Sequence, residues 1–320
     1  MPYLGVASRA SLMNKTQLYY DDRSMSQART VVFLHDWPLN RQAWEYPVAL
    51  FSRGYRTITI DLPGFGRSDQ PGGLISYESY ARDVAALVTV LDLSQIILVG
   101  AGMGAGVAVS YALGYARTLA GLVLVGALSP RWTRAPGFPQ GVARDTVESL
   151  LDKSQTNWPD LLTYYAGSLC HTAVGEPTKR WFVNMGLEAS LYAVQQSLIF
   201  MRNADQRDDL ASINVPTAIF HGVHDAIAPF AIGEYLAENI NNAQLTRFEH
   251  SGHATWIDEK YRFNTELTGF IEERAFGNVL PPPGVERTPD GGERLPFKAI
   301  ATRPHRGRPK LEGPTGEIYE

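Results

Sequence analysis

The chain has 320 residues, of which 44% are hydrophobic, and a formal net charge of −4 at pH 7. A chain of this size can bury a large core, and its charge provides no overall attraction to nucleic acid or to an anionic membrane. The single cysteine, Cys170, excludes an internal disulfide framework, and no apolar run approaches the roughly 20 residues that span a bilayer. The first residues also lack the pattern of a secretory signal, so a cytoplasmic location is the default expectation.

Short apolar runs alternate with amphipathic helical patterns along the chain. We expect strands at residues 30–34, 55–60, 96–99, 119–125, 218–221 and 245–248, and helices at about 77–91 and 104–115. Residues 17–20 and 31–34 flank a polar Asp-Asp-Arg-Ser segment, which predicts an antiparallel hairpin at the start of the sheet. Apolar strands separated by helices predict an α/β protein with a mostly parallel sheet covered on both faces.

Residues 131–210 have a helical pattern and are rich in aromatic side chains. Most of these aromatics are expected to pack a small helical cap onto the sheet, because aromatic side chains dominate the energetics of such layers. A few would line an apolar substrate pocket under the cap, and Trp158, Trp181 and Phe182 are our candidates. The expected organisation is a core of residues 1–130 and 211–275 with a cap of residues 131–210.

Residues 276–320 form a tail rich in proline, glycine and charged side chains, without a periodic apolar pattern. Such a segment cannot recover its ordering entropy, so we expect it to be largely disordered. Within it, Arg306, Gly307, Arg308 and Pro309 resemble the core of an AT-hook, which binds the narrow minor groove of A·T-rich DNA. The single copy and the acidic body of the chain argue against nucleic-acid binding and favour a soluble basic tail.

A sharp turn between a strand and a helix is predicted at Gly100-Ala101-Gly102-Met103-Gly104. This arrangement is typical of a nucleophile elbow, in which the G-x-S-x-G motif presents a serine hydroxyl above the sheet. Here Gly102 occupies the reactive position. Glycine has no atom with which to attack a carbonyl carbon, so this position cannot form a covalent acyl-enzyme.

Four motifs occur in a specific order along the chain. They are His35-Asp36-Trp37-Pro38, Asp61-Leu62-Pro63-Gly64-Phe65-Gly66-Arg67-Ser68, the elbow at Gly102, and His221-Gly222-Val223-His224-Asp225 followed by Ser251-Gly252-His253. Together they resemble the α/β-hydrolase fold superfamily over about residues 1–273, and their details are similar to the branch of cofactor-free haloperoxidases, which are also esterases and perhydrolases. The resemblance implies an eight-stranded, mostly parallel sheet, a small helical cap, no cofactor, and a glycine in place of the family's nucleophilic serine.

The resemblance also assigns roles to individual residues. The family's acid falls on Asp225 and its histidine on His253, a pair in which the carboxylate orients the imidazole and stabilises its charged form. The two oxyanion donors would be the backbone N–H groups of Trp37 and Met103, which survive a change of side chain. A surface position for His253 is the alternative interpretation, with His250 and His224 as neighbouring decoys. No cluster of side chains has the spacing of metal ligands.

A second departure from the family pattern lies at Asp36, where the family has glycine after the histidine. A carboxylate at the edge of the oxyanion loop would oppose a developing negative charge, unless it points away or is protonated. Two interpretations of Asp36 are open. In one, its side chain faces solvent or caps a turn. In the other, it enters the space left at Gly102 and serves as an acid, as a base or as a group that positions a water molecule.

Three functions remain open. The first is an enzyme without a serine nucleophile, in which His253 and Asp225 act as a general base on a small, largely apolar carbonyl or ester-type substrate, as a lyase, a cyclase or a water-activating hydrolase. The second is a haloperoxidase-like esterase or perhydrolase silenced by the loss of its serine. The third is a non-catalytic protein that binds a small ligand. We expect a small-molecule partner and no membrane partner, while the substrate and the existence of a homo-oligomer stay open.

Overall fold

The computed structural model of the chain describes residues 3–7, 15–23, 29–70, 73–277, 286–287 and 293–294. Contacts divide the chain into one unit of Met1–Leu280 and another of Pro281–Glu320. In the second unit the described residues are those of β9 (Glu286–Arg287) and β10 (Glu293–Arg294), which pair antiparallel. The predicted disorder of the rest of the tail, and the AT-hook-like Arg306–Pro309 segment, lie outside the described residues.

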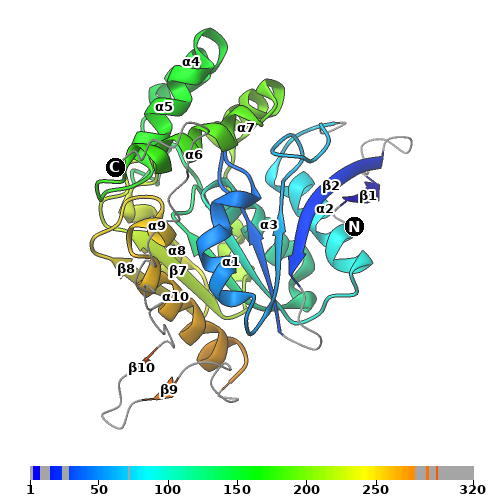
Figure 1. Ribbon diagram of the computed structural model, residues 1–320. Coiled ribbons are helices and arrows are strands. Elements are labelled where there is room, and N and C mark those ends of the chain that lie inside the picture. The colour runs from blue at the N-terminus through cyan, green and yellow to red at the C-terminus, as the bar shows by residue number, and fades with distance from the viewer. Residues whose placement is uncertain are drawn as a thin grey trace, which may run out of the picture. The chain divides into compact units, whose positions relative to one another are not determined.

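A mostly parallel sheet forms the centre of the first unit (Figure 1). Strands β2 to β8 make up its central part, β1 pairs with β2 at the edge, and the order is β1-β2-β4-β3-β5-β6-β7-β8. The strands are β1 (Tyr3–Ala7), β2 (Lys15–Arg23), β3 (Thr30–Leu34), β4 (Arg56–Ile60), β5 (Ile96–Ala101), β6 (Leu119–Val125), β7 (Thr217–Gly222) and β8 (Ala243–Phe248). Strands β3 to β8 run parallel to one another, whereas β1 pairs antiparallel with β2 and β2 pairs antiparallel with β4. The predicted α/β-hydrolase fold is therefore confirmed.

The predicted hairpin at the start of the sheet is wrong. Strand β2 pairs antiparallel with β4, in the register Tyr20↔Ile60, and not with β3. The chain leaves β3 through α1 (Glu45–Phe51) and returns as β4 on the side of β3 that the hairpin would have used. Because a parallel crossover of this kind places its second strand directly beside the first, β2 is displaced by one position in the sheet.

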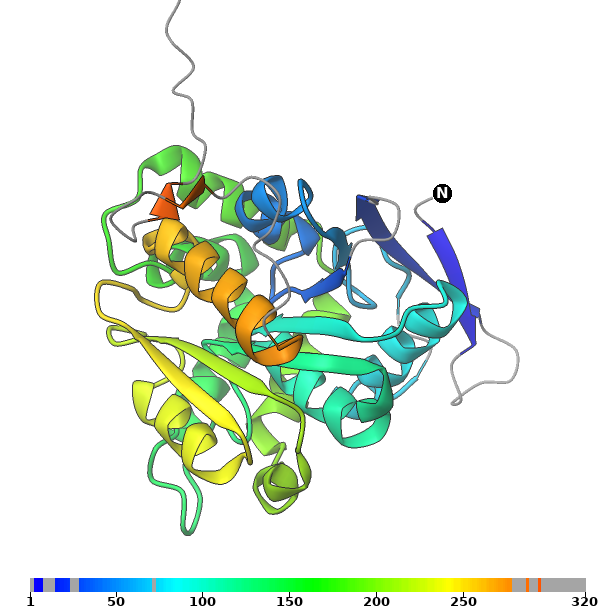
Figure 2. The same cartoon turned by 90° about the horizontal axis from the view of Figure 1, so that it is seen from below.

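Helices cover both faces of the sheet, as Figure 2 shows from below. Helices α1 and α10 pack together on one face, and α2, α3 and α8 lie on the other. The remaining bounds are α2 (Tyr77–Val90), α3 (Met103–Tyr115), α4 (Arg144–Thr156), α5 (Trp158–Ser168), α6 (Glu176–Leu187), α7 (Leu191–Asn203), α8 (Phe230–Asn239), α9 (Thr255–Asp258) and α10 (Lys260–Gly269), with short turns of 3₁₀ helix η1 (Arg41–Trp44), η2 (Ala116–Thr118) and η3 (Arg207–Ser212) and a π-helical end η4 (Phe270–Ala275). Within the described part of the chain, no helix has both the length and the apolar composition needed to cross a membrane.

The central strands are buried on both faces. Every residue of β3, β5 and β6 is buried, which explains why their sequences read as continuous apolar runs rather than alternating patterns. Helix α3 packs so closely on the sheet that a side chain on Gly104 would meet the carbonyl oxygens of Leu34 and His35 at 2.6 Å. This close packing fixes the start of α3 against the end of β3.

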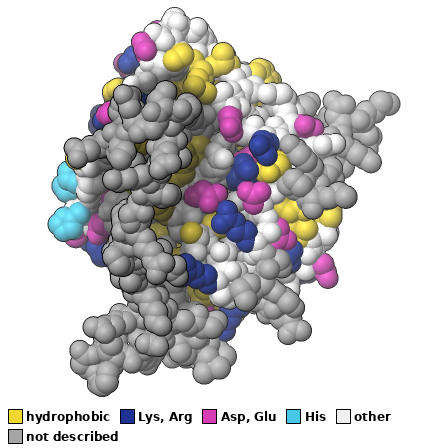
Figure 3. Space-filling view, in the orientation of Figure 1, with side chains coloured by type: hydrophobic (Ala, Val, Ile, Leu, Met, Phe, Trp, Pro, Cys, Tyr) yellow, Lys and Arg dark blue, Asp and Glu magenta, His cyan; other side chains and the backbone are white. Residues whose placement is uncertain are grey.

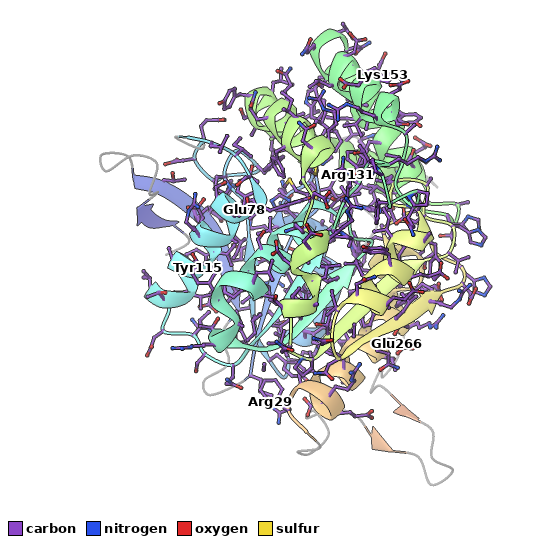
Figure 4. All side chains as sticks on the ribbon, turned by 180° about the vertical axis from the view of Figure 1, so that it is seen from behind. Arg29, Glu78, Tyr115, Arg131, Lys153 and Glu266 are labelled. Carbon is purple, nitrogen blue, oxygen red and sulfur yellow. The ribbon has the colours of Figure 1, made fainter. Side chains whose placement is uncertain are left out.

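Helices α4 to α7 are inserted between β6 and β7 and gather at one end of the sheet (Figure 1). Figure 4 labels Lys153 at the outer end of this group and Arg131 near the point where the segment leaves the sheet. The side chains of Asn157 and Ser190 accept hydrogen bonds from backbone N–H groups in the first turns of α5 and α7 and so mark where these helices begin. The boundaries of the predicted cap, residues 131–210, stay a prediction.

Candidate functional site

The predicted site residues lie in loops at the carboxyl ends of parallel strands. Asp36 follows β3, Gly102 follows β5, Asp225 follows β7 and His253 follows β8. Since these strands are parallel, their carboxyl ends meet at the same edge of the sheet, where ligands of open α/β sheets usually bind. The structure brings Asp36, Gly102, Met103, Asp225 and His253 together at this edge.

The turn at Gly102 has the strained backbone expected of an elbow. Gly102 has φ 49° and ψ −111°, a conformation that is unfavourable for residues with a side chain. Its N–H donates to the carbonyl oxygen of Val125 at 3.0 Å, and its own carbonyl oxygen accepts from the N–H groups of Ala105 and Leu128, each at 3.2 Å. These bonds hold the turn in place, so its shape does not depend on a side chain at residue 102.

The carboxylate of Asp36 occupies the space beside Gly102. A Cβ atom built on Gly102 would lie 1.7 Å from Asp36 Oδ1 and 2.1 Å from Asp36 Cγ. The Asp36 side chain is fully buried, which contradicts the solvent-facing alternative for this residue. The carboxylate therefore stands where the elbow's own side chain would stand.

Three hydrogen-bond donors converge on the Asp36 carboxylate. The N–H of Met103 donates to Oδ1 at 2.8 Å, the hydroxyl of Tyr165 donates to Oδ2 at 2.7 Å, and Nε2 of His253 lies 3.1 Å from Oδ2. Burial and the nearby carboxylate keep the pKa of the Tyr165 phenol well above its ordinary value, so this hydroxyl remains a donor. The expected oxyanion donor Met103 is thus already occupied by a carboxylate of the same chain.

His253 lies between two carboxylates. Its Nδ1 is 2.7 Å from Asp225 Oδ2, on the opposite side of the ring from Asp36, and Asp225 Oδ1 accepts from the N–H groups of Ile227 and Ala228 at 2.8 Å each. Burial alone would lower the pKa of the His253 imidazole, but the carboxylates of Asp225 and Asp36 outweigh it and raise this pKa to about 10. Burial likewise opposes ionisation of Asp225, yet the charged His253 ring holds the pKa of that carboxyl well below its usual range. At neutral pH the His253 ring is therefore an imidazolium, and it lies between Asp225 and Asp36.

The neighbouring His35 holds the loop that carries Asp36. Its Nδ1 lies 2.9 Å from the Asp36 carbonyl oxygen, and its Nε2 accepts from the N–H of Leu62 at 3.0 Å. One nitrogen is thus a donor and the other an acceptor, which requires a neutral ring. Burial, which lowers the pKa of His35, acts in the same direction.

Trp37, the second expected oxyanion donor, lies beneath the helices inserted after β6. Its indole Nε1 donates to the carbonyl oxygen of Val194 in α7 at 3.2 Å, and its ring packs edge-on against Tyr165 and Trp158 of α5 at 5.1 and 6.2 Å. Among the described residues, no hydrogen-bond acceptor is found for the backbone N–H of Trp37. The Met103 N–H, in contrast, is bonded to Asp36.

The three predicted pocket residues lie in different surroundings. Trp158 is in contact with Trp37 beside the site, whereas Trp181 packs against Tyr46 and Phe182 at ring distances of 5.9 and 5.3 Å. Phe182 is almost fully buried. A substrate pocket that includes all three side chains stays a prediction.

Asp258 ties the loop of His253 to the end of α5. Its carboxylate accepts from the N–H groups of His171, Thr172 and Gly252 at 2.9, 3.0 and 2.8 Å, and also from the Thr172 hydroxyl. The N–H of Ala254 donates to the carbonyl oxygen of Leu169 at 2.7 Å in the same contact. Because α5 carries Tyr165, this contact fixes two of the three donors to Asp36 relative to each other.

His224 and His250, the neighbours of Asp225 and His253 that could be confused with the catalytic histidine, lie outside the site. His224 and His250 are exposed, and the ring of His224 stacks on that of His171 with a centroid distance of 3.8 Å. Figure 3 shows exposed histidine side chains at the left edge of the molecule, in the orientation of Figure 1. In the ranges that the structure describes, no group of three or more His, Cys, Asp or Glu side chains is arranged to hold a metal ion.

Sequence reasoning missed Tyr165 and Asp258. A signal for Tyr165 was present in the spacing of Leu161, Leu162, Tyr165 and Leu169, which places Tyr165 on the buried side of α5 and its neighbour Tyr164 on the exposed side. For Asp258 there was no signal, because its partners lie far away in the sequence and are mainly backbone N–H groups.

Comparisons with known proteins agree with this architecture. The model of the alpha/beta hydrolase fold family matches residues 29–260. The chain is 34% identical over 255 residues to the AB hydrolase superfamily protein YisY of Bacillus subtilis (strain 168), covering 79% of this chain and 94% of that protein. It is 31% identical over 285 residues to a putative non-heme chloroperoxidase of Synechocystis, covering 85% of this chain and 100% of that protein. Among solved structures, an esterase from Exiguobacterium antarcticum superposes with a TM-score of 0.78 at 33% identity, covering 81% of this chain and 97% of that one.

Proposed function

The chain belongs to the alpha/beta hydrolase fold family, and from this premise we propose that it is an enzyme of that family that works without a covalent serine nucleophile. The observation that carries the proposal is the position of the Asp36 carboxylate, 1.7 Å from a Cβ atom built on Gly102. The atom that other members would use for attack is replaced here by a carboxylate that can accept a proton.

The reaction proposed is proton transfer at a carbon or oxygen atom next to a carbonyl group. Asp36 accepts the proton, and His253, already charged, donates one from Nε2 to the carbonyl or leaving-group oxygen. In this mechanism His253 is the acid and not the base, because an imidazole with a raised pKa already holds its proton before the substrate binds. The N–H of Trp37, for which no acceptor is found among the described residues, would hold the carbonyl oxygen, and Asp225 would stabilise the imidazolium.

The charge of the site limits the substrate class. The His253 ring lies between the buried acidic side chains of Asp36 and Asp225, so acidic groups outnumber basic ones among these three side chains. An anionic group beside Asp36 would be repelled in these buried surroundings. We therefore propose a small, uncharged and largely apolar carbonyl substrate, in keeping with the aromatic rings of Trp37, Trp158 and Tyr165 around the site. Elimination, ring closure or lactone opening by an activated water are reactions of this kind.

A silenced esterase or perhydrolase is the second candidate. It is favoured by the relatives named as an esterase and a chloroperoxidase, and by the His253–Asp225 pair and the turn at Gly102. Against it stands the Met103 N–H, which is bonded to Asp36 and is not free to stabilise an oxyanion.

Deuterium exchange in heavy water tests the proposal. The native chain is incubated with a series of small neutral ketones, enol esters and lactones, and loss of the proton next to the carbonyl is followed by NMR. We expect exchange or conversion that falls by on the order of 10²-fold in Asp36→Asn and in His253→Gln. The exposed His224→Gln is the matched control and should leave the rate unchanged.

Three results would overturn the proposal. Exchange that is unaffected by Asp36→Asn would remove Asp36 from the mechanism. A covalent adduct of substrate mass on Asp36 would replace proton transfer by nucleophilic attack. If the protein binds compounds of the series tightly but neither exchanges nor converts any of them, it is a ligand-binding protein and not an enzyme of this kind.

A further inference from the structure

The donors around Asp36 have the arrangement of a receptor for a carboxylate. The Met103 N–H approaches one oxygen, and the Tyr165 hydroxyl and His253 Nε2 approach the other, at distances between 2.7 and 3.1 Å. Charge-assisted hydrogen bonds of this kind are the strong ones, and donors to both oxygens favour a planar two-oxygen anion over a single-atom anion.

Each donor is fixed by contacts that do not involve Asp36. Met103 begins the 13-residue helix α3, whose N-terminus favours negative charge. The Tyr165 ring packs edge-on against Trp37, and Asp225 holds His253 from the far side of the imidazole. The Asp258 contact fixes α5 and the histidine loop to each other. The donors should therefore keep their positions when the Asp36 side chain is absent.

We propose that Met103 N–H, Tyr165 hydroxyl and His253 Nε2 form a carboxylate-binding cradle that Asp36 fills as an internal ligand, and that a small free carboxylate binds there when the Asp36 side chain is withdrawn. The cradle requires no turnover, so the proposal goes beyond the proposed reaction and its failure would leave that reaction untouched.

The three donors that lose their acceptor support this occupant. Without Asp36, the His253 imidazolium and the Asp225 carboxylate compensate each other, and three buried donors lose their acceptor. Buried donors without an acceptor are costly, and a formate or acetate ion restores both the hydrogen bonds and the negative charge. In the native chain the attached carboxylate competes at a far higher effective concentration than a free one, so no exogenous carboxylate should bind.

The experiment compares Asp36→Ala, Asp36→Asn and the native chain, each titrated with sodium formate at constant ionic strength. Binding is followed through the His253 ring signals in NMR and through the melting temperature. In Asp36→Ala we expect saturable shifts of the His253 signals with a Kd in the millimolar range and a rise in melting temperature. Asp36→Asn fills the same space with an amide, so it is the matched control and should not respond, and neither should the native chain.

The double variant Asp36→Ala/Tyr165→Phe tests the geometry of the cradle, and we expect its formate Kd to rise at least about fivefold, the loss of one charge-assisted hydrogen bond. Asp36→Ser replaces Asp36→Ala if the latter does not fold, since its side chain also leaves the carboxylate position empty. Three results would overturn the proposal. The first is an equal response to formate in Asp36→Asn and in the variant with the shortened side chain (Asp36→Ala or Asp36→Ser), and the second is a formate Kd that Tyr165→Phe does not change. The third is the absence of a response in both Asp36→Ala and Asp36→Ser. Equal binding of chloride and formate would reduce the cradle to a nonspecific anion site and also overturn it.

Discussion

The carboxylate of Asp36 fills the space that a side chain at Gly102 would need, since a Cβ atom built on Gly102 would lie 1.7 Å from Asp36 Oδ1. A side chain at residue 102 and the carboxylate in its present position therefore exclude each other. The two departures that the sequence resemblance implies, at Asp36 and at Gly102, are therefore sterically coupled. A serine at residue 102 beside an unchanged Asp36 creates a steric overlap in a buried site, whereas Asp36→Gly alone removes the carboxylate without supplying a nucleophile.

Restoring both positions should produce an esterase. In Gly102→Ser the new side chain overlaps Asp36, and the Met103 N–H stays engaged as long as Asp36 remains nearby. In Asp36→Gly/Gly102→Ser the carboxylate is gone and Met103 can donate to an oxyanion. Because one oxyanion donor contributes on the order of 10²–10³-fold in rate, the double variant should hydrolyse a small activated aryl ester at least about 10²-fold faster than the single variant.

Adding His253→Gln to each variant is the control for this prediction, and the double variant should lose its turnover and its initial burst of product. A single Gly102→Ser that equals the double variant would show that Asp36 moves aside at little cost. A double variant without any esterase activity would show that the loop of Asp36 no longer supports an oxyanion hole.

Four members of the site were predictable because each follows a strand and lies within a short motif. Asp36, Gly102, Asp225 and His253 occupy loops whose place in the fold follows from strand order alone. The position of the Asp36 carboxylate was open between solvent and the site, because a side-chain rotamer depends on neighbours that a sequence does not place. Its three donors settle that question in the structure.

Other features depended on contacts between distant segments. The α/β-hydrolase fold with its mostly parallel sheet was predictable from the apolar runs and motif order, but the pairing of β2 was not, since a hairpin and an inserted strand give the same local sequence pattern. Tyr165 acts from a helix far from the loops it contacts, and its neighbour Tyr164 has the same chemistry on the opposite side of that helix. The partners of Asp258 are mainly backbone N–H groups that only the fold brings near its carboxylate.

The stability of the protein should fall as the pH rises above neutrality. The pKa of His253 in the folded state is about 10, above its ordinary value of 6.5, so the folded chain holds this proton more tightly than the unfolded chain. The resulting stabilisation is fully present below the ordinary value and is lost as the pH rises towards 10, by at most about 1.4 kcal/mol per pH unit. The lowered pKa of Asp225 acts at the other end, with stabilisation lost as the pH falls below the ordinary value of 3.8.

Asp36→Asn removes one of the two carboxylates that raise the pKa of His253. The loss of stability at alkaline pH should therefore begin at the same pH but end at a lower one, which urea unfolding of both proteins between about pH 6 and pH 10 will measure. NMR titration of the His253 ring provides the matching pKa. Identical pH profiles for the two proteins would mean that Asp36 does not share the His253 proton.

Asp258 should control the orientation of His253 without touching it. Asp258→Ala removes the acceptor of three N–H groups and one hydroxyl, and we expect it to lower the free energy of unfolding by about 2 kcal/mol or more. The His253 ring signals should broaden or shift, because the loop of Gly252 loses the hydrogen bonds through which Asp258 ties it to the segment after α5. The more conservative Asp258→Asn should partly restore those signals.

The exposed Asp152→Asn in α4 is the control for the Asp258 variants and should leave both stability and the ring signals unchanged. A destabilised Asp258→Ala with unchanged His253 signals would assign Asp258 a purely structural role.

The Tyr165 hydroxyl should stabilise the fold only through Asp36. Tyr165→Phe keeps the ring that packs against Trp37 and removes the hydrogen bond to Oδ2, so a buried carboxylate loses one of its three donors. We expect the free energy of unfolding to fall by about 1.5–3 kcal/mol, the usual contribution of a hydrogen bond to a charged group. Tyr164→Phe, whose side chain is 62% exposed on the same helix, should change it by less than about 0.5 kcal/mol. In the Asp36→Ala background Tyr165→Phe should no longer destabilise the protein, because the acceptor is already gone, and a full loss of stability there would show that the hydroxyl acts through some other partner.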